Sequence, residues 1–421
     1  GALTSTALLY TGHAERVREF INWYIPYQYD NGKVPCVVDR RGPDPVPEND
    51  STGEMIYLLA RYYEFTHDRE PLERFYPNVV KGVAYLERLR ATRKTPEYAK
   101  GPEEKRVLYG LVPESISHEG YSAKPMHSYW DGFFVIRGYR DAAKIAEVLG
   151  KPEDAQRFTT LCNDYRQCMR ESMERVIRLH KLDYLPGCAE LGDFDATSTA
   201  IGIYPCNECA WLPDQLDGTF KKYLKFFRDR RDGTLEWENY TPYEMRIMSA
   251  LIHMQEPAAA HELLAYFMAD QTPPEWNQWG EVVWRDHDTP RFIGDYPHTW
   301  VASEFLRAVR NMFVLEDEQR RAVILGAGID PAWLADGNVV SITDWPTPYG
   351  PVSYCVQLED NTLLVKLAAQ TTPPGGFIYR LREFGYAQSM LLDGARLNFS
   401  QCRDIQLRTP TADIEIELRR D

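Results

Sequence analysis

The 421-residue sequence lacks the patterns of several common classes of protein. No apolar run approaches the roughly 18 residues that cross a bilayer, so no membrane partner is expected. Acidic residues outnumber basic ones by 62 to 48, and no basic stripe is long enough to follow a phosphate backbone. Nucleic acid is therefore not expected as a partner either. The Gly-x-Ser-x-Gly, phosphate-loop and His-Glu-x-x-His motifs are also missing, which argues against serine hydrolases, P-loop enzymes and zinc peptidases.

The eight cysteines are scattered along the chain and do not form a dense disulfide framework. This pattern predicts free thiols and favours a cytoplasmic protein, with a periplasmic or secreted one as the alternative if a signal precedes the chain. Aromatic residues, in contrast, reach 13%, with ten Trp and 26 Tyr. Such rings stack on the faces of sugars, although packing within a large helical domain also uses them.

From residue 1 to about residue 315, apolar residues recur at helical spacing. Tight polar turns alternate with long loops rich in Pro, Gly, Trp and acidic residues, which is typical of a toroid built from helical hairpins. Functional side chains tend to lie on such long loops. Amphipathic helices are expected at 11–24, 54–66, 71–90, 129–149, 153–178, 216–228, 242–254, 258–270 and 299–315.

After Glu318 the apolar pattern changes to a period of two, interrupted by acidic and glycine turns. We therefore expect a mainly α fold, with an (α/α)6 toroid in residues 1–318 and a small antiparallel β-sandwich in residues 319–421. About ten helices can be counted in the first part, and residues 2–9 already resemble a buried helix. We expect that an upstream segment of the protein is missing from this chain.

Carboxylates collect beside aromatic rings at residues 111–134, just before an expected helix. A carboxyl group packed against rings loses solvation, which raises its pKa and lets it donate a proton near neutral pH. Glu119, Glu114 and Asp131 are the candidates for this role, and His127 and Trp130 are candidate ligands for a substrate. Helix capping by Ser128, with Asp131 favouring the helix dipole, is the alternative interpretation.

A second concentration, at residues 273–300, carries four Trp in a long loop. A loop of this length is usually either functional or disordered, and the tryptophans argue against disorder. Glu281 is the candidate general base, and an ion pair with Arg285 or Arg291 is the alternative for it. The expected sugar-contacting residues of this segment are Trp279, Trp284 and His298.

Two smaller acidic groups precede expected helices. Asp50 lies in the first, and Asp193 and Asp195 lie in the second. Carboxylates of this kind can accept hydrogen bonds from sugar hydroxyls. Each group also has the sequence of a helix N-cap, so capping is an equally good interpretation.

With these residues in view, the first 315 positions resemble the six-hairpin glycosidases, most closely the glucoamylase-like glycoside hydrolases. The matching segments are GALTSTALLYTGHAERVREFINWY, DSTGEMIYLLARYY, DFDATSTAIGIYP and WGEVVWRDHDTPRFIGDYPHTWVASEFL. The resemblance places the catalytic base on Glu281 and the catalytic acid nearest to Glu119, with Glu114 and Asp131 as alternatives. A Trp-Asp pair serves as the acid in trehalase-like relatives, which keeps Asp131 open.

The helical part followed by β-strands is also similar to bacterial α-L-rhamnosidases, through YGLVPESISHEGYSAKPMHSYWD and WNQWGEVVWRD. The resemblance implies an inverting glycoside hydrolase that acts on a carbohydrate. Inversion requires the two carboxyl groups to lie roughly 6.5–9.5 Å apart. No metal or organic cofactor is expected. The alternatives are a sugar-binding toroid without catalysis, or a polysaccharide lyase using His118, His127 and Tyr121.

Overall fold

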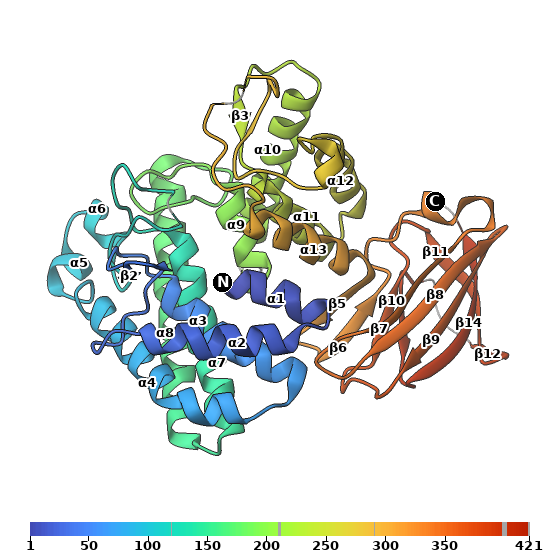
Figure 1. Ribbon diagram of the computed structural model, residues 1–421, viewed down its shortest axis with the longest axis horizontal. Helices are drawn as coiled ribbons and strands as arrows, with labels where there is room; N and C mark the ends of the chain where they lie inside the picture. Colours follow the sequence, from blue (N-terminus) through green and yellow to red (C-terminus); the bar gives the residue numbers. More distant parts are fainter. Residues whose placement is uncertain (119, 209–211, 290, 398–401, 420–421) are drawn as a thin grey trace. The chain divides into compact units, whose positions relative to one another are not determined.

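The computed structural model describes residues 1–118, 120–208, 212–289, 291–397 and 402–419 (Figure 1). Two compact units make up the chain. The first contains Gly1–Ser5 and Ala14–Glu236, and the second contains Thr6–His13 and Trp237–Asp421. The domain boundary expected at residue 318 stays a prediction.

The first unit is helical, and each helix expected there is present within a few residues of its predicted ends. Helix α9 follows Asp195, where a helix was expected. The helices that were missed, α5 and α6, lie in a stretch expected to be a long loop, because five and four residues are too few to show a helical period. Helix α1 (Ala2–Tyr10) is divided between the units. The other helices of the first unit are α2 (Ala14–Tyr24), α3 (Ser51–Thr66), α4 (Glu70–Ala91), α5 (Pro96–Lys100), α6 (Glu103–Arg106), α7 (Tyr129–Val148), α8 (Pro152–His180), α9 (Ala196–Ile203) and α10 (Pro213–Arg231).

Helices α3 and α7 pack closely through two glycines. A Cβ atom placed on Gly53 would lie 2.0 Å from the carbonyl oxygen of Phe134, and one on Gly138 would lie 2.7 Å from the Cα of Gly53. Helix α7 is buried along most of its length, including its first turn. The close approach of these helices brings their N-terminal residues into one buried region.

Within the described residues, the second unit contains the end of α1, three complete helices and two large sheets. The helices are α11 (Met245–His253), α12 (Pro257–Ala269) and α13 (Thr299–Phe313). The strands, orange to red in Figure 1, are β5 (Val314–Asp317), β6 (Ala322–Leu325), β7 (Val339–Trp345), β8 (Val352–Glu359), β9 (Thr362–Ala369), β10 (Phe377–Arg380), β11 (Tyr386–Leu392), β12 (Ala395–Leu397), β13 (Asp404–Leu407) and β14 (Thr411–Arg419). One sheet has the order β13-β10-β6-β5 and the other β12-β11-β14-β9-β8-β7.

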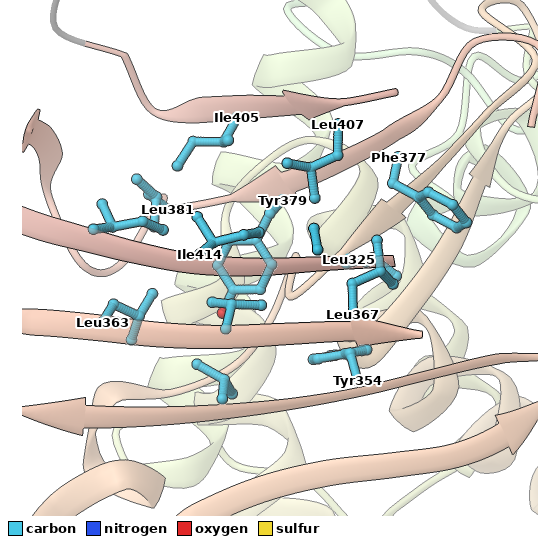
Figure 2. Packing of buried hydrophobic residues seen from close by; sticks show 14 of the residues in the cluster. Leu325, Tyr354, Leu363, Leu367, Phe377, Tyr379, Leu381, Ile405, Leu407 and Ile414 are labelled. Carbon is cyan, nitrogen blue, oxygen red and sulfur yellow. The ribbon is translucent and has the colours of Figure 1, made fainter. Parts of the chain in front are cut away.

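The two sheets share one apolar core, as a sandwich requires. Figure 2 shows Leu325 and Tyr379 of the four-stranded sheet packed with Leu363 and Ile414 of the six-stranded sheet. Along β14, buried and exposed residues alternate, which is the period-two pattern of the sequence. The pairing is antiparallel except between β6 and β10, which run parallel.

Two short strand pairs lie outside the sandwich. Val38–Asp39 (β1) pairs with Gly42–Pro43 (β2), and Asn239–Tyr240 (β3) pairs with Val283–Trp284 (β4). Within the described ranges, no helix combines the length and apolar character needed to cross a bilayer.

Candidate active site

Two buried carboxyl groups of the first unit meet the start of α7. Asp50 immediately precedes α3, and its Oδ2 accepts a 2.7 Å hydrogen bond from the indole Nε1 of Trp130. Asp131 lies in the first turn of α7, and its Oδ2 accepts a 2.6 Å hydrogen bond from the hydroxyl of Ser115. The structure thus brings three residues singled out in the sequence into one contact group.

Burial changes the protonation of this carboxyl pair. Loss of solvation, followed by the nearby charge of Asp50, raises the pKa of Asp131 from 3.8 to about 8. Burial also raises the pKa of Asp50, although the hydrogen bond from Trp130 acts in the opposite direction. Two carboxylates in one dry site cannot both be ionised at little cost. Asp131 therefore carries a proton at neutral pH.

The second oxygen of Asp131 is also buried. Among the described residues, Oδ1 has no hydrogen-bond partner. An unsatisfied buried polar atom in a native protein calls for an explanation, such as a functional role or a bound water.

The capping interpretation holds for Ser128 and Asp195 but not for Asp50. Ser128 accepts a hydrogen bond from the Trp130 amide at the start of α7. Asp195 likewise accepts one from the Ser198 amide at 3.0 Å and so caps α9. Asp50 precedes α3, but its side chain makes no capping hydrogen bond, because its Oδ2 accepts from Trp130 instead.

His118 lies between the buried carboxyl pair and the second acidic group. Its ring stacks on Trp130 with a centroid distance of 4.4 Å, and its Nδ1 is 2.9 Å from the Ser117 hydroxyl. Both Ser117 and His118 have a positive φ, an uncommon conformation for residues other than glycine and a form of local strain. Glu119, the expected acid, follows directly and lies outside the described residues.

Residues 187–195 lie close to His118 and Tyr121, although they come more than 60 positions later in the chain. Although burial favours a higher value, the charge of His118 and the hydroxyls of Ser198 and Thr197 lower the pKa of Asp195. The Tyr121 hydroxyl donates to Asp193 Oδ2 at 2.9 Å.

Gly187 marks how closely these side chains pack. A Cβ atom on Gly187 would lie 2.8 Å from the Cβ of Asp195 and 2.9 Å from the Tyr121 hydroxyl. Asp50, Asp131, Asp193 and Asp195 are therefore linked, through Trp130, His118 and Tyr121, into one polar cluster of the first unit.

Glu114 and His127 belong to a neighbouring ionic cluster. Glu114 is half exposed and pairs with Arg93. Partial burial acts to raise the pKa of Glu114, but a backbone hydrogen bond and Arg93 outweigh it, and the pKa is lowered. His127 is buried, with its Nδ1 2.6 Å from Glu190 and its Nε2 accepting from Arg93 Nε at 3.0 Å. A carboxyl group with a lowered pKa is ionised at neutral pH and is a poor proton donor.

Glu281 lies in the second unit, between Trp279 and β4. Its amide donates to the Asp295 carbonyl at 3.3 Å. Its side chain is half-buried and covers Gly294, where an added Cβ would lie 2.1 Å from Glu281 Oε2. Among the described residues, neither arginine considered for an ion pair with Glu281 forms one, and Arg291 pairs instead with Glu238 at 3.8 Å.

The aromatic residues near Glu281 differ in exposure. Trp279 is 2% exposed and donates its Nε1 hydrogen to the Phe267 carbonyl at 2.9 Å. Trp130 of the first unit is likewise fully buried. The rings of these two residues pack inside the protein and do not form open walls, whereas Trp284 is half-buried.

His298 is held at the start of α13 by a residue that the sequence did not single out. Its Nε2 lies 2.7 Å from the Tyr243 hydroxyl, and the Tyr243 ring packs on Trp300 at 4.7 Å. Ser115, the donor to Asp131, was missed in the same way. Tyr and Ser are too common for their positions alone to indicate a site, and only spatial proximity identifies them.

A comparison with protein families finds a match within the helical part of the chain. Residues 2–173 match the family profile of the bacterial alpha-L-rhamnosidase six-hairpin glycosidase domain. Among curated proteins, no sequence match is found.

No group of three or more His, Cys, Asp or Glu that could hold a metal ion occurs among the described residues.

Solved structures share the fold at low sequence identity. The alpha-L-rhamnosidase of Dictyoglumus thermophilum matches 99% of this chain with a TM-score of 0.64 and 14% identity. The alpha-L-rhamnosidase of Streptomyces avermitilis, solved with L-rhamnose, matches 99% with a TM-score of 0.54 and 14% identity. The family 78 rhamnosidase of Bacillus sp. GL1 matches 90% with a TM-score of 0.58 and 13% identity.

This chain spans less than half the length of these structures, since it covers 45%, 37% and 39% of them in the same order. The expected fold class, a mainly helical toroid followed by a β-sandwich, is confirmed by the shared fold. Together, the profile match and this fold confirm the resemblance of the chain to the six-hairpin glycoside hydrolase superfamily.

Proposed function

We propose that the chain is the six-hairpin part of an inverting glycoside hydrolase, with residues 1–318 as its catalytic domain and residues 319–421 as an accompanying β-sandwich. One observation carries the proposal. In the part that matches the glycosidase profile, the buried carboxyl group of Asp131 lies beside Asp50 and has a pKa of about 8. Glycoside hydrolysis needs a carboxyl environment in which a proton is retained at neutral pH.

The proposed mechanism uses two carboxyl groups in different roles. Glu119 gives a proton to the departing glycosidic oxygen, and Asp131 is the alternative donor. Glu281 removes a proton from a water molecule that attacks the anomeric carbon from the opposite face of the ring, which inverts its configuration. Glu114 suits the donor role less well, because Arg93 helps to lower its pKa.

The substrate is proposed to be an oligosaccharide, polysaccharide or glycoside. Asp193 and Asp195 are only partly buried and have oxygens that can accept hydrogen bonds from hydroxyl groups. His127 and His298 are each held by a polar partner, and Trp284 offers a half-buried ring. Trp130, Trp279 and Asp50 are buried, so each is proposed to hold its neighbours in place within its own unit. Because the fold matches rhamnosidases, an α-L-rhamnoside is the first substrate to test.

The test is a panel of 4-nitrophenyl glycosides beginning with the α-L-rhamnoside, with the anomer of the product followed by proton NMR. We expect release of the inverted anomer. Glu281→Gln should lower kcat at least a thousandfold with little change in substrate binding. The matched control is Glu275→Gln, an exposed residue of the same loop, which should leave kcat unchanged. A retained anomer, or full activity in Glu281→Gln, would contradict the mechanism.

A sugar-binding toroid without turnover is the second candidate. It is favoured by the complete burial of Asp131 and by the pairing of Glu114 with Arg93, which leave neither as an exposed proton donor. Saturable binding of a sugar in calorimetry, with no hydrolysis of any glycoside in the panel, would support it.

A further inference from the structure

Tyr243 and His298 form a contact in the second unit that joins two segments distant in the sequence. Tyr243 lies in the short helical turn Pro242–Glu244, and His298 immediately precedes α13. The Tyr243 hydroxyl is 2.7 Å from Nε2 of His298, and the two rings meet edge to face with their centroids 5.4 Å apart. The sequence indicated His298 as a sugar-contacting residue but gave no role to Tyr243.

The backbone anchors this pair on both sides of the proposed base. The His298 amide donates to the carbonyl of Trp279, two positions before the base, at 3.4 Å. Tyr240 pairs with Val283, two positions after the base, where β3 meets β4. Because Tyr243 follows Tyr240 by only three positions, both members of the pair are held beside the segment that carries the base.

The Tyr243 ring is fixed by its neighbours. It packs on Trp300 with a centroid distance of 4.7 Å, and the Arg246 guanidinium lies 5.3 Å from its centroid. Glu304 holds both of these neighbours, since it accepts from the Trp300 indole at 3.2 Å and lies 3.4 Å from Arg246. A ring packed in this way has little freedom to turn, so its hydroxyl keeps one direction.

The surrounding charges favour Tyr243 as the donor in the pair. A cation close to the ring stabilises negative charge on the phenolic oxygen, which makes the hydroxyl a better donor. His298 is the N-cap residue of α13, where the positive end of the helix dipole disfavours a charged imidazole. A neutral imidazole has one N–H and one acceptor nitrogen, and the bond at one nitrogen determines where the proton lies. With the Tyr243 hydroxyl donating to Nε2, the proton of His298 lies on Nδ1.

The position of this proton matters for a sugar ligand. Free histidine in water favours the proton on Nε2, so without Tyr243 the ring would present the opposite pattern of donor and acceptor. A sugar hydroxyl matched to one pattern meets the wrong group in the other. The loss of one such hydrogen bond weakens binding about three- to tenfold.

We propose that Tyr243 is a positioning residue for His298, which it holds with the proton on Nδ1 so that Nδ1–H donates to a sugar hydroxyl. The position of the proton stands on the contact itself, whereas the sugar contact rests on the proposed hydrolase function. Tyr243 touches no substrate in this arrangement and acts only through His298.

The position of the proton is tested without any sugar. Long-range proton–nitrogen NMR spectra of the 421-residue chain, labelled in its histidines, report which ring nitrogen is protonated at pH 8. The signals of His298 are those that disappear in His298→Gln. We expect a proton on Nδ1 in the unchanged protein and a shift toward Nε2 in Tyr243→Phe, which keeps the ring and its contacts with Trp300 and Arg246.

The matched control is Tyr296→Phe, which removes a hydroxyl two positions from His298 and should leave the proton on Nδ1. A proton on Nε2 in the unchanged protein overturns the assignment of Tyr243 as the donor. So does an unchanged spectrum of His298 in Tyr243→Phe, or an equal change in both variants.

The sugar contact is tested with the sugar that the panel identifies. Tyr243→Phe should raise KM about three- to tenfold while kcat stays within about twofold. Because Tyr243 acts only through His298, the same substitution should have no further effect on KM in His298→Ala. An unchanged KM in the single variant, or effects that multiply in the double variant, overturn the positioning role. A proton on Nδ1 as expected, with no glycoside hydrolysed, overturns the hydrolase proposal and supports the assignment of Tyr243.

Discussion

The indole of Trp130 donates a 2.7 Å hydrogen bond to the Asp50 carboxylate, joining two residues that are 80 positions apart. Both side chains are buried, and the bond ties the N-terminus of α3 to the first turn of α7. A buried carboxylate needs such donors, because it has lost its hydrogen bonds to water. The contact therefore holds the carboxyl pair of Asp50 and Asp131 in place.

Removal of this donor should destabilise the first unit. Trp130→Phe leaves Asp50 without its indole partner and leaves space where the larger ring was, at a combined cost of about 2–4 kcal/mol in the free energy of unfolding. Urea denaturation at pH 7 measures it. Trp23→Phe, at a residue that is 48% exposed, is the control and should cost less than about 0.5 kcal/mol. Equal effects of the two substitutions would contradict the importance of the bond.

Asp131 should make stability fall as the pH rises. Its pKa is about 8 in the folded protein and near 3.8 when exposed, so the folded state binds more protons between these values. The contribution is complete below about pH 4 and is lost as the pH rises toward 8. Asp131→Asn should flatten this decline, as measured by urea midpoints at several pH values. Asp183→Asn, an exposed change, should leave the slope as it is, and a parallel decline in Asp131→Asn would argue against the shifted pKa.

The contact between α3 and α7 should not tolerate a methyl group at Gly53. The new Cβ would lie 2.0 Å from a backbone oxygen of Phe134, so the helices would have to move apart. We expect Gly53→Ala to cost about 3 kcal/mol or more, in keeping with overpacked cores. At Gly82 the nearest atom is a methyl carbon of Thr52 at 3.0 Å, and Gly82→Ala should cost far less. Thermal denaturation compares the two, and similar melting temperatures would contradict the packing argument.

A buried ionic network should stabilise the helices of the second unit. Glu304 is fully buried, lies 3.0 Å from Arg307 and 3.4 Å from Arg246, and accepts from the Trp300 indole at 3.2 Å. Glu304→Ala removes the negative charge between two buried arginines, at a cost of about 3–5 kcal/mol. Glu19→Ala is the matched control, because Glu19 and Arg16 have the same sequence spacing but are more than half exposed. It should change stability by less than about 0.5 kcal/mol in the same urea titration, and a comparable loss would refute the burial argument.

Much of the fold could be predicted because the periodic patterns that indicate helices and strands involve residues close together in the chain. The helical period defined α7 and α8 within a few residues, and the alternation along β14 defined a sandwich strand. Helices α5 and α6 were missed because elements of five and four residues are too short to show a helical period. The parallel pairing of β6 with β10 was missed because strand order depends on distant segments.

The candidate site was predicted only in part. The sequence places carboxylates next to tryptophans, but it does not show which of these tryptophans and carboxylates are buried. Trp130 and Trp279 were expected to contact a sugar, whereas both are buried. Trp279 donates its indole hydrogen to the Phe267 carbonyl, a residue 12 positions away, and composition does not indicate such a bond. Ser115 and Tyr243 were missed because nothing in their local sequence distinguishes them from other serines and tyrosines.

By itself, the sequence determined the types of element and the acidic, ring-rich loops, because both depend on residues that are neighbours along the chain. Tertiary structure decided what each carboxylate does. Asp50 and Asp195 both precede a helix, yet Asp195 caps α9 while Asp50 accepts the indole hydrogen of Trp130. The difference arises because a cap needs only the next turn of the helix, whereas the partner of Asp50 and the raised pKa of Asp131 depend on which distant residues exclude water.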